Sequence, residues 1–187
     1  MDRALVVVGT SWGGLNALSQ LLRRLPDTFR LPMAIVQHRG KEGTSVLRDL
    51  LQDCTRLRVR EVEDKDALEE GNIYLAPPDY HLLVEEGHFA LSVDPAVRYS
   101  RPSIDVTFSS AADSYGSRLV GVVLTGANDD GARGLRCIAD RGGVAIVQDP
   151  ATAEVSVMPR AALAEVPTAE VATVDRMAAR ILALQAP

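Results

Sequence analysis

Short continuous apolar runs alternate along the chain with segments whose apolar residues recur every three or four positions. A continuous apolar run is typical of a strand that is buried on both faces of a parallel sheet, and the longer spacing is typical of an amphipathic helix. The runs, together with an alternating segment at 57–62, predict strands over residues 4–8, 32–37, 57–62, 72–76, 118–124 and 144–148. The periodic segments predict helices over residues 14–25, 45–54, 103–115, 132–140, 159–164 and 174–184.

One part of the pattern departs from this alternation. Residues 80–85 and 88–93 are two strand-like segments separated by Glu86-Gly87, and this arrangement predicts a β-hairpin. The whole order predicts an α/β fold: a doubly wound, mostly parallel sheet with helices on both faces and an inserted antiparallel β-hairpin. No linker or internal repeat divides the sequence, so we expect a single domain over residues 1–187. Such sheets bind ligands beyond the carboxyl ends of their strands.

Composition narrows the classes of function. The chain carries 20 Lys and Arg against 25 Asp and Glu, a net charge of −5, which argues against nucleic acid and an anionic membrane surface as partners. No stretch approaches the roughly 18 apolar residues of a membrane span, and the first apolar run is too short for a signal peptide, so we expect a cytoplasmic protein without membrane insertion. Cys54 and Cys137 form no disulfide framework or zinc motif, and we expect two buried small side chains.

The first predicted strand runs into residues 9–14, with the sequence Gly-Thr-Ser-Trp-Gly-Gly, before a helix begins. Three glycines allow a tight turn, and Ser11 would lie at the corner beside free N–H groups at the helix N-terminus. This placement suits a nucleophile whose tetrahedral intermediate needs an oxyanion hole, and the segment formally matches G-x-S-x-G. A phosphate-binding turn and a purely structural turn are the alternatives, although the loop lacks the G-x-G-x-x-G spacing and a P-loop lysine.

The second predicted strand ends at His38, and consecutive strands are usually neighbours in a sheet. A neutral imidazole at this position could accept the proton of Ser11 and return it to a leaving group. The alternative is a hydrogen-bonded histidine at a strand end. His81 and His88 fall in the predicted hairpin, where we expect solvent-facing or hairpin-pair residues.

The apolar strand over residues 118–124 leads into a loop that carries Asp129 and Asp130 directly before a Gly-Ala helix start. One interpretation is helix capping by either carboxylate. The other is an acid that orients the imidazole of His38 and stabilises its protonated form. Ser11, His38 and an aspartate would then follow three strands at the same edge of the sheet, and this coincidence favours the catalytic interpretation.

With these residues in place, the sequence resembles the catalytic domain of chemotaxis receptor protein-glutamate methylesterases, the CheB type. The resemblance extends over nearly the whole chain and depends on ordered blocks rather than on a single motif. The matching blocks are residues 8–14 (VGTSWGG), 35–38 (IVQH), 71–78 (GNIYLAPP), 101–110 (RPSIDVTFSS), 123–126 (VLTG), 130–132 (DGA), 148–149 (QD) and 158–162 (MPRAA).

The resemblance implies a serine hydrolase that removes methyl esters from receptor glutamates and releases methanol, with deamidation of certain receptor glutamines as a further activity. It implies no metal and no organic cofactor, and the cytoplasmic domain of a methylated receptor as substrate. By the family pattern Ser11 is the nucleophile, His38 the general base and Asp130 the orienting acid. The oxyanion hole would use the backbone N–H groups of Trp12 and Ala127.

Several positions depart from the family pattern. Trp12 stands where a small residue is usual, Arg39 where a methionine commonly follows the histidine, and Ala127-Asn128 replaces Met-Gly. The sequence contains no receiver domain, so we expect either constitutive activity or control by a receiver or regulatory protein in trans. Such a partner would dock near Trp12, Arg39 and the loop at residues 128–130, unless these residues only shape the substrate pocket.

Two other classes of function remain open from the sequence. A non-catalytic binding or regulatory module of the same fold would engage a methyl-accepting protein or a methyltransferase, and turnover of a methylated receptor separates it from an enzyme. A nucleotide-binding domain would place an acidic residue at the end of the second strand to hold a ribose, and this chain has His38 there.

Overall fold

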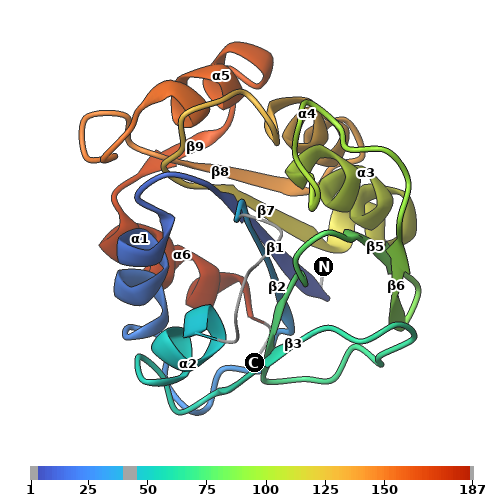
Figure 1. Ribbon diagram of the computed structural model, residues 1–187. Helices are drawn as coiled ribbons and strands as arrows, with labels where there is room; N and C mark the ends of the chain where they lie inside the picture. The colour runs from blue at the N-terminus through green and yellow to red at the C-terminus, as the bar shows by residue number, and fades with distance from the viewer. Residues whose placement is uncertain (1–3, 40–45, 186–187) are drawn as a thin grey trace.

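The computed structural model describes residues 4–39 and 46–185, and its centre is a seven-stranded sheet (Figure 1). Every adjacent pair of strands is parallel. The order across the sheet is β3 (Arg58–Glu61), β4 (Asn72–Leu75), β2 (Met33–Gln37), β1 (Leu5–Thr10), β7 (Leu119–Val123), β8 (Val144–Gln148) and β9 (Glu170–Ala172). The predicted doubly wound arrangement is confirmed.

Helices cover both faces of this sheet, as Figure 1 shows. One face is covered by α1 (Gly14–Leu22), α2 (Val46–Gln52) and α6 (Val174–Leu184), and the other by α3 (Ile104–Tyr115), α4 (Ala132–Asp140) and α5 (Val157–Glu165). In β1, Val6 and Val8 pack into the first layer, whereas Leu5 and Val7 pack into the second, and all four side chains are fully buried. Burial on both faces explains why the central strands are continuously apolar.

The inserted hairpin forms its own antiparallel sheet from β5 (His81–Glu85) and β6 (His88–Ser92). It is joined to α3 by side-chain hydrogen bonds: Thr107 Oγ1 donates to the carbonyl of Leu82 (2.8 Å), and Ser114 Oγ donates to that of Val84 (2.9 Å). A short 3₁₀ turn, η1 (Gly116–Arg118), connects α3 to β7. The predicted hairpin is therefore confirmed as an addition to the layer that contains α3.

Apart from shifts of one or two residues at several ends, the elements differ from the sequence-based expectation at β9 and at the end of α1. Strand β9 was not predicted, because its three residues are largely exposed and form no apolar run. Helix α1 ends at Leu22 instead of residue 25, where i→i+3 bonds from Arg24 and Leu25 take over. The reason is Pro26, which disfavours helical geometry in the residue before it. Ser45, the expected start of the second helix, lies outside the described residues.

Three individual residues behave differently from the expectation. His81 does not face solvent: it is 1% exposed, its Nδ1 accepts a hydrogen bond from the backbone N–H of Ser103 (3.2 Å), and its Nε2 contacts the carbonyl of Pro95 (3.1 Å). Cys54 and Cys137 are free, as expected, but only half-buried. His88 pairs with Glu85 inside the hairpin at 2.7 Å, as expected.

None of the helices in the described ranges is both long and apolar enough to cross a membrane.

Candidate functional site

The strands that precede the candidate residues are neighbours at the middle of the sheet. In the register, Thr10 of β1 pairs with Gln37 of β2, so Ser11 and His38 follow paired positions. The backbone N–H of His38 donates to the carbonyl of Thr10 (3.1 Å), and that of Ser11 donates to the carbonyl of Thr125 beyond β7 (3.0 Å). The carboxyl ends of β2, β1 and β7 therefore bring the three predicted segments to one edge, where doubly wound sheets bind ligands.

Ser11 lies half-buried in a sharp turn between β1 and α1. Its carbonyl accepts hydrogen bonds from the backbone N–H of Gly14 (2.9 Å) and from Gln37 Nε2 (2.8 Å). Gly13 has φ +77°, and a Cβ on Gly14 would lie 2.0 Å from Gln37 Oε1. The turn therefore requires glycine at both positions.

His38 contacts Asp130 directly: its Nε2 lies 2.7 Å from Asp130 Oδ2. The imidazole is 11% exposed, whereas the carboxylate is fully buried. A carboxylate is only an acceptor, so Nε2 donates and the other ring nitrogen, Nδ1, is left for a different partner. That partner is the side chain of Asn128, whose Nδ2 lies 3.4 Å from Nδ1.

The carboxylate of Asp130 receives three further hydrogen bonds, all from the start of α3. Ser103 Oγ and the backbone N–H of Asp105 donate to Oδ1 (both 3.0 Å), and the backbone N–H of Ile104 donates to Oδ2 (2.7 Å). Burial by itself would raise the pKa of Asp130. The hydrogen bonds from His38 and these backbone N–H groups outweigh it, and the pKa is lowered. Asp130 is therefore held as a carboxylate facing His38.

The start of α4 is capped by Asp105, which belongs to α3. Its Oδ1 accepts hydrogen bonds from the backbone N–H groups of Gly131 (2.9 Å) and Gly134 (2.8 Å). Burial, reinforced by the neighbouring charge of Asp130, raises the pKa of Asp105 despite these bonds. The interpretation that Asp129 or Asp130 caps the following helix is wrong, since Asp130 caps α3 and Asp129 forms an ion pair with Arg98.

Two cavities adjoin His38. The larger cavity, of about 610 Å³, lies on the Ser11 side. The exposed side chains of Trp12 and Leu15 line it, and so does Glu154. The smaller, of about 310 Å³, lies toward Arg39 and the segment 96–102. Ser11 thus opens onto a space with apolar walls, as the pocket for an ester side chain requires.

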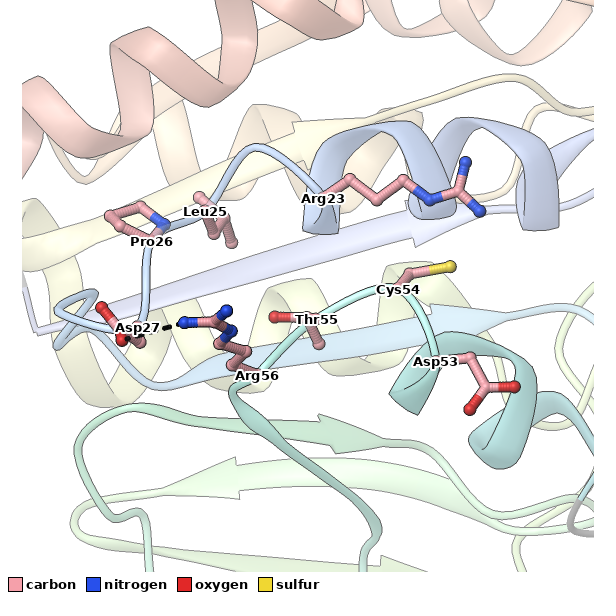
Figure 2. Close-up of a pocket in the computed structure, with 8 residues that line it drawn as sticks. All are labelled: Arg23, Leu25, Pro26, Asp27, Asp53, Cys54, Thr55 and Arg56. Carbon is pink, nitrogen blue, oxygen red and sulfur yellow. Dashed lines mark ion pairs between the residues drawn. The ribbon is translucent and has the colours of Figure 1, made fainter.

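A third cavity, of about 450 Å³, lies far from these residues in the fold (Figure 2). Its walls are the loops that lead into β2 and β3, at the amino ends of the strands, and the ion pair of Asp27 with Arg56 (3.9 Å) crosses it. None of the predicted site residues lines it. The position opposite the carboxyl edge separates it from the candidate site.

The remaining predicted residues have different surroundings. Trp12 is 67% exposed and Ala127 is exposed, and the backbone N–H of each donates no hydrogen bond within residues 4–39 and 46–185. Arg39 instead is 10% exposed, and its Nη2 donates to Glu61 Oε1 (2.5 Å) and to the carbonyl of Ala76 (2.9 Å). Trp12 is therefore available to a partner, whereas the guanidinium of Arg39 is part of a pocket wall.

Sequence reasoning missed the groups that support Asp130 and His38. Ser103, Asp105 and Asn128 contact them directly, and only Ser103 had a recognisable signal: a serine after Pro102 at a helix start is a typical N-cap. Within the part of the chain that the structure describes, no three His, Cys, Asp or Glu side chains gather as a metal site would require.

This sheet, with a serine, a histidine and an aspartate at its carboxyl edge, defines an α/β protein that carries the residue set of a serine hydrolase. A family model described as CheB methylesterase matches residues 6–181. The chain belongs to the CheB methylesterase family.

Individual relatives agree with this assignment. A Leptospira interrogans protein, provisionally named protein-glutamate methylesterase/protein-glutamine glutaminase, is 44% identical over 87% of this chain and 85% of its own length. Protein-glutamate methylesterase FrzG of Myxococcus xanthus is 42% identical over 95% of this chain and 54% of its own length. The crystal structure of the Thermotoga maritima CheB methylesterase catalytic domain superposes with a TM-score of 0.94 at 30% identity, covering 98% of this chain and 100% of that one.

Proposed function

We propose that this protein is a serine hydrolase that removes methyl esters from glutamate side chains of chemotaxis-type receptors and releases methanol. The observation that carries the proposal is the 2.7 Å contact of His38 with buried Asp130, one strand away from Ser11. Membership of the CheB methylesterase family supports the ester substrate. Relatives named both methylesterase and glutaminase support deamidation of receptor glutamines as a second activity.

His38 is the general base, and Nδ1 is the nitrogen that acts. Because Nε2 donates to Asp130, neutral imidazole carries its proton on Nε2 and its lone pair on Nδ1. As Ser11 Oγ attacks the ester carbonyl carbon, its proton moves to Nδ1. The carbonyl electron pair moves to oxygen, and the carboxylate of Asp130 stabilises the imidazolium.

The oxyanion of the tetrahedral intermediate would bind the backbone N–H groups of Trp12 and Ala127, which have no other acceptor in the described ranges. When the intermediate collapses, the bond to the methoxy oxygen breaks, and His38 gives its proton to this oxygen, so that methanol leaves. Water then attacks the glutamyl ester of Ser11 by the same proton transfers, which restores the hydroxyl and frees glutamate. With a glutamine substrate, ammonia leaves in place of methanol.

The surroundings of Ser11 suit a receptor segment as substrate. The cavity of about 610 Å³ is large enough for an extended ester side chain, and exposed Trp12 and Leu15 offer apolar contact to the chain that carries it. We place this reaction in the cytoplasm, on the cytoplasmic domain of the receptor. A receiver or regulatory protein acting in trans would also use Trp12, whose exposed side chain lies beside Ser11.

A non-catalytic binding module is the second candidate, and one observation favours it. Within the described residues, the hydroxyl of Ser11 makes no hydrogen bond with His38, and the amide of Asn128 lies at Nδ1 instead. Turnover distinguishes the two functions, because a binding module would engage a methylated receptor without releasing methanol.

The test is methanol release from a purified receptor that carries labelled methyl esters. Ser11→Ala should lower the rate by several orders of magnitude, because a triad nucleophile is lost. Its free energy of unfolding should change by no more than about 0.5 kcal/mol, since a half-buried hydroxyl leaves no core cavity. Ser19→Ala, in α1, is the matched control and should retain full turnover. Wild-type turnover by Ser11→Ala would refute the assignment.

A further inference from the structure

Asn128 lies between the two residues on which the proposed mechanism depends. It belongs to the loop from β7 to α4 and is half-buried. Its Oδ1 accepts a hydrogen bond from the backbone N–H of Asp130 (3.2 Å), and its Nδ2 lies 3.4 Å from Nδ1 of His38. One amide group therefore connects the main chain of the orienting acid to the ring nitrogen that would act as base.

The orientation of this amide is determined by its partners. A backbone N–H can only donate, so the atom that faces the N–H of Asp130 must be the oxygen. Rotating the amide by 180° would bring its NH₂ group against that N–H, two donors without an acceptor. The NH₂ end of Asn128 is therefore directed at His38.

The hydrogen-bond partners of the two ring nitrogens of His38 consequently require the same protonation state. Nδ2 of Asn128 donates, so Nδ1 must offer its lone pair, and Nε2 must carry the hydrogen that it donates to Asp130 at 2.7 Å. This is the neutral tautomer that a base acting through Nδ1 needs. An imidazolium would place an N–H at Nδ1 against the NH₂ of Asn128.

The same contact competes with the nucleophile. An imidazole nitrogen has one lone pair in the plane of the ring and accepts one hydrogen bond. In the described part of the chain that bond comes from Asn128, and the hydroxyl of Ser11 donates none to His38. At 3.4 Å the bond is long, so a well-aligned hydroxyl can displace it.

We propose that Asn128 is a positioning residue that holds His38 in its Nε2–H tautomer and covers Nδ1 until the hydroxyl of Ser11 replaces its amide. This inference rests on the proposed function, since it describes how the base of that reaction is kept in readiness. The contact selects the tautomer that the reaction needs. Before substrate binds, it also keeps Nδ1 of His38 from accepting a hydrogen bond from the hydroxyl of Ser11.

Substitution at position 128 leaves the native charged groups that face His38 in place. Asn128→Asp adds one carboxylate beside Nδ1, whereas Asn128→Ala adds no charge. The neighbouring residue Arg39 is one of these native charged groups. The others are Asp79, Arg101 and Glu154, which line the two cavities, and Asp130, which lies in the loop after β7. Arg39 is paired with Glu61, and Arg101 with Asp79.

The first test uses Asn128→Asp, which keeps an oxygen for the N–H of Asp130 and replaces only the donor that faces His38. A carboxylate at this position favours imidazolium, so the acid limb of the pH profile of kcat/KM should move up by about one pH unit or more. At neutral pH, phosphonylation of Ser11 by a fluorophosphonate, in which fluoride leaves and the hydroxyl proton passes to His38, should slow about tenfold. An unchanged profile and an unchanged labelling rate would overturn the proposal.

The second test uses Asn128→Ala, which uncovers Nδ1 and leaves the tautomer to Asp130. Labelling of Ser11 in the absence of substrate should become about fivefold faster, the change expected for loss of one competing hydrogen bond. A purely structural role in the loop predicts the opposite result for Asn128→Ala, slower labelling, and this outcome would overturn the proposal.

Nitrogen NMR of the wild-type chain supplies a reading that needs no enzyme activity. The imidazole of His38 should carry its hydrogen on Nε2, and a hydrogen on Nδ1 at neutral pH would overturn the proposal. Turnover by Ser11→Ala would refute the proposed function while leaving this tautomer measurement intact, so the two failures are distinguishable.

Discussion

At the scale of single residues, the fully buried carboxylate of Asp130 is the group on which the site depends most. A buried charge is costly unless it is paired and hydrogen-bonded. Asp130 receives two backbone N–H groups and a serine hydroxyl and contacts His38 at 2.7 Å. These partners compensate its burial and leave it ionised beside the imidazole.

Asp130→Asn should therefore disable the enzyme far more than Asp129→Asn. An asparagine can donate to the imidazole, which favours the wrong tautomer, and it has no charge to stabilise imidazolium, so we expect kcat to fall by roughly 10³–10⁴. Asp129 is 60% exposed and paired with Arg98, and its loss should cost under about 1 kcal/mol of stability with activity retained. Methanol release by both variants is the measurement, and an inactive Asp129→Asn would contradict the assignment.

The lowered pKa of Asp130 also predicts how stability depends on pH. A carboxyl with a depressed pKa in the folded state contributes stability above its unfolded pKa, about 3.9, and loses it as pH falls through the folded value. Urea unfolding of the wild type and Asp130→Asn, from pH 6 to pH 2.5, should give free energies that differ most at pH 6 and converge under acid conditions. A difference that stays constant would mean that the carboxylate charge contributes nothing.

At the scale of elements, α3 and α4 are capped reciprocally: the N-terminus of each helix donates hydrogen bonds to a carboxylate at the start of the other. Asp130, before α4, accepts from the first N–H groups of α3, and Asp105, in the first turn of α3, accepts from N–H groups at the start of α4. Gly134 allows the two helices to approach closely, because a Cβ there would lie 2.5 Å from Cβ of Phe108. These hydrogen bonds tie the orientation of α3 to the position of the loop that carries Asp130.

Asp105→Ala should destabilise the protein by about 1–2 kcal/mol, since it removes the oxygen that accepts both hydrogen bonds at the start of α4. Asp105→Asn keeps an oxygen at the same place but removes the negative charge. The raised pKa of the Asp105 carboxyl shows that the folded protein disfavours this charge, so the stability of Asp105→Asn should stay close to that of the wild type. Urea unfolding compares the two variants. Equal losses in both would show that the charge, rather than the hydrogen bonds, stabilises the helix start.

At the scale of the whole molecule, the three candidate residues depend on three central strands. Ser11, His38 and the loop with Asp130 follow β1, β2 and β7, which are adjacent and buried except for Gln37 at the end of β2. The backbone amide hydrogens of such central strands exchange with solvent last, because they are exposed only by global unfolding, whereas surface elements open locally. The site is therefore coupled to the part of the fold that unfolds globally.

We expect inactivation by urea to coincide with the loss of secondary structure. If the protein unfolds in two states, the midpoints of methanol release and of far-ultraviolet circular dichroism should agree. Fluorescence of Trp12, which is 67% exposed and the only tryptophan, is a poor substitute for the dichroism signal. Inactivation at clearly lower urea would mean that the loop at residues 127–130 opens before the sheet does.

Much of this architecture was predictable, because the signals are local. The apolar runs of β1, β2 and β7 located the central strands, and their ends drew attention to Ser11, His38 and Asp130. Strand β9 was missed because three exposed residues leave no periodic pattern. His81 pairs with Ser92 in the hairpin as expected, but its burial was not predicted, because it comes from contacts with Pro95 and Ser103, which are distant in sequence.

The sequence by itself determined the type and approximate bounds of the elements and the residues that follow each strand, since side-chain periodicity acts over a few positions. Tertiary structure alone decided which strands are neighbours, which helix each carboxylate caps and which nitrogen of His38 meets Asp130. It also brought Asn128 to the free nitrogen. The hydrogen bonds of Asp130 with Asp105 and His38 join partners 25 and 92 positions apart, which only the packed sheet brings within hydrogen-bond distance.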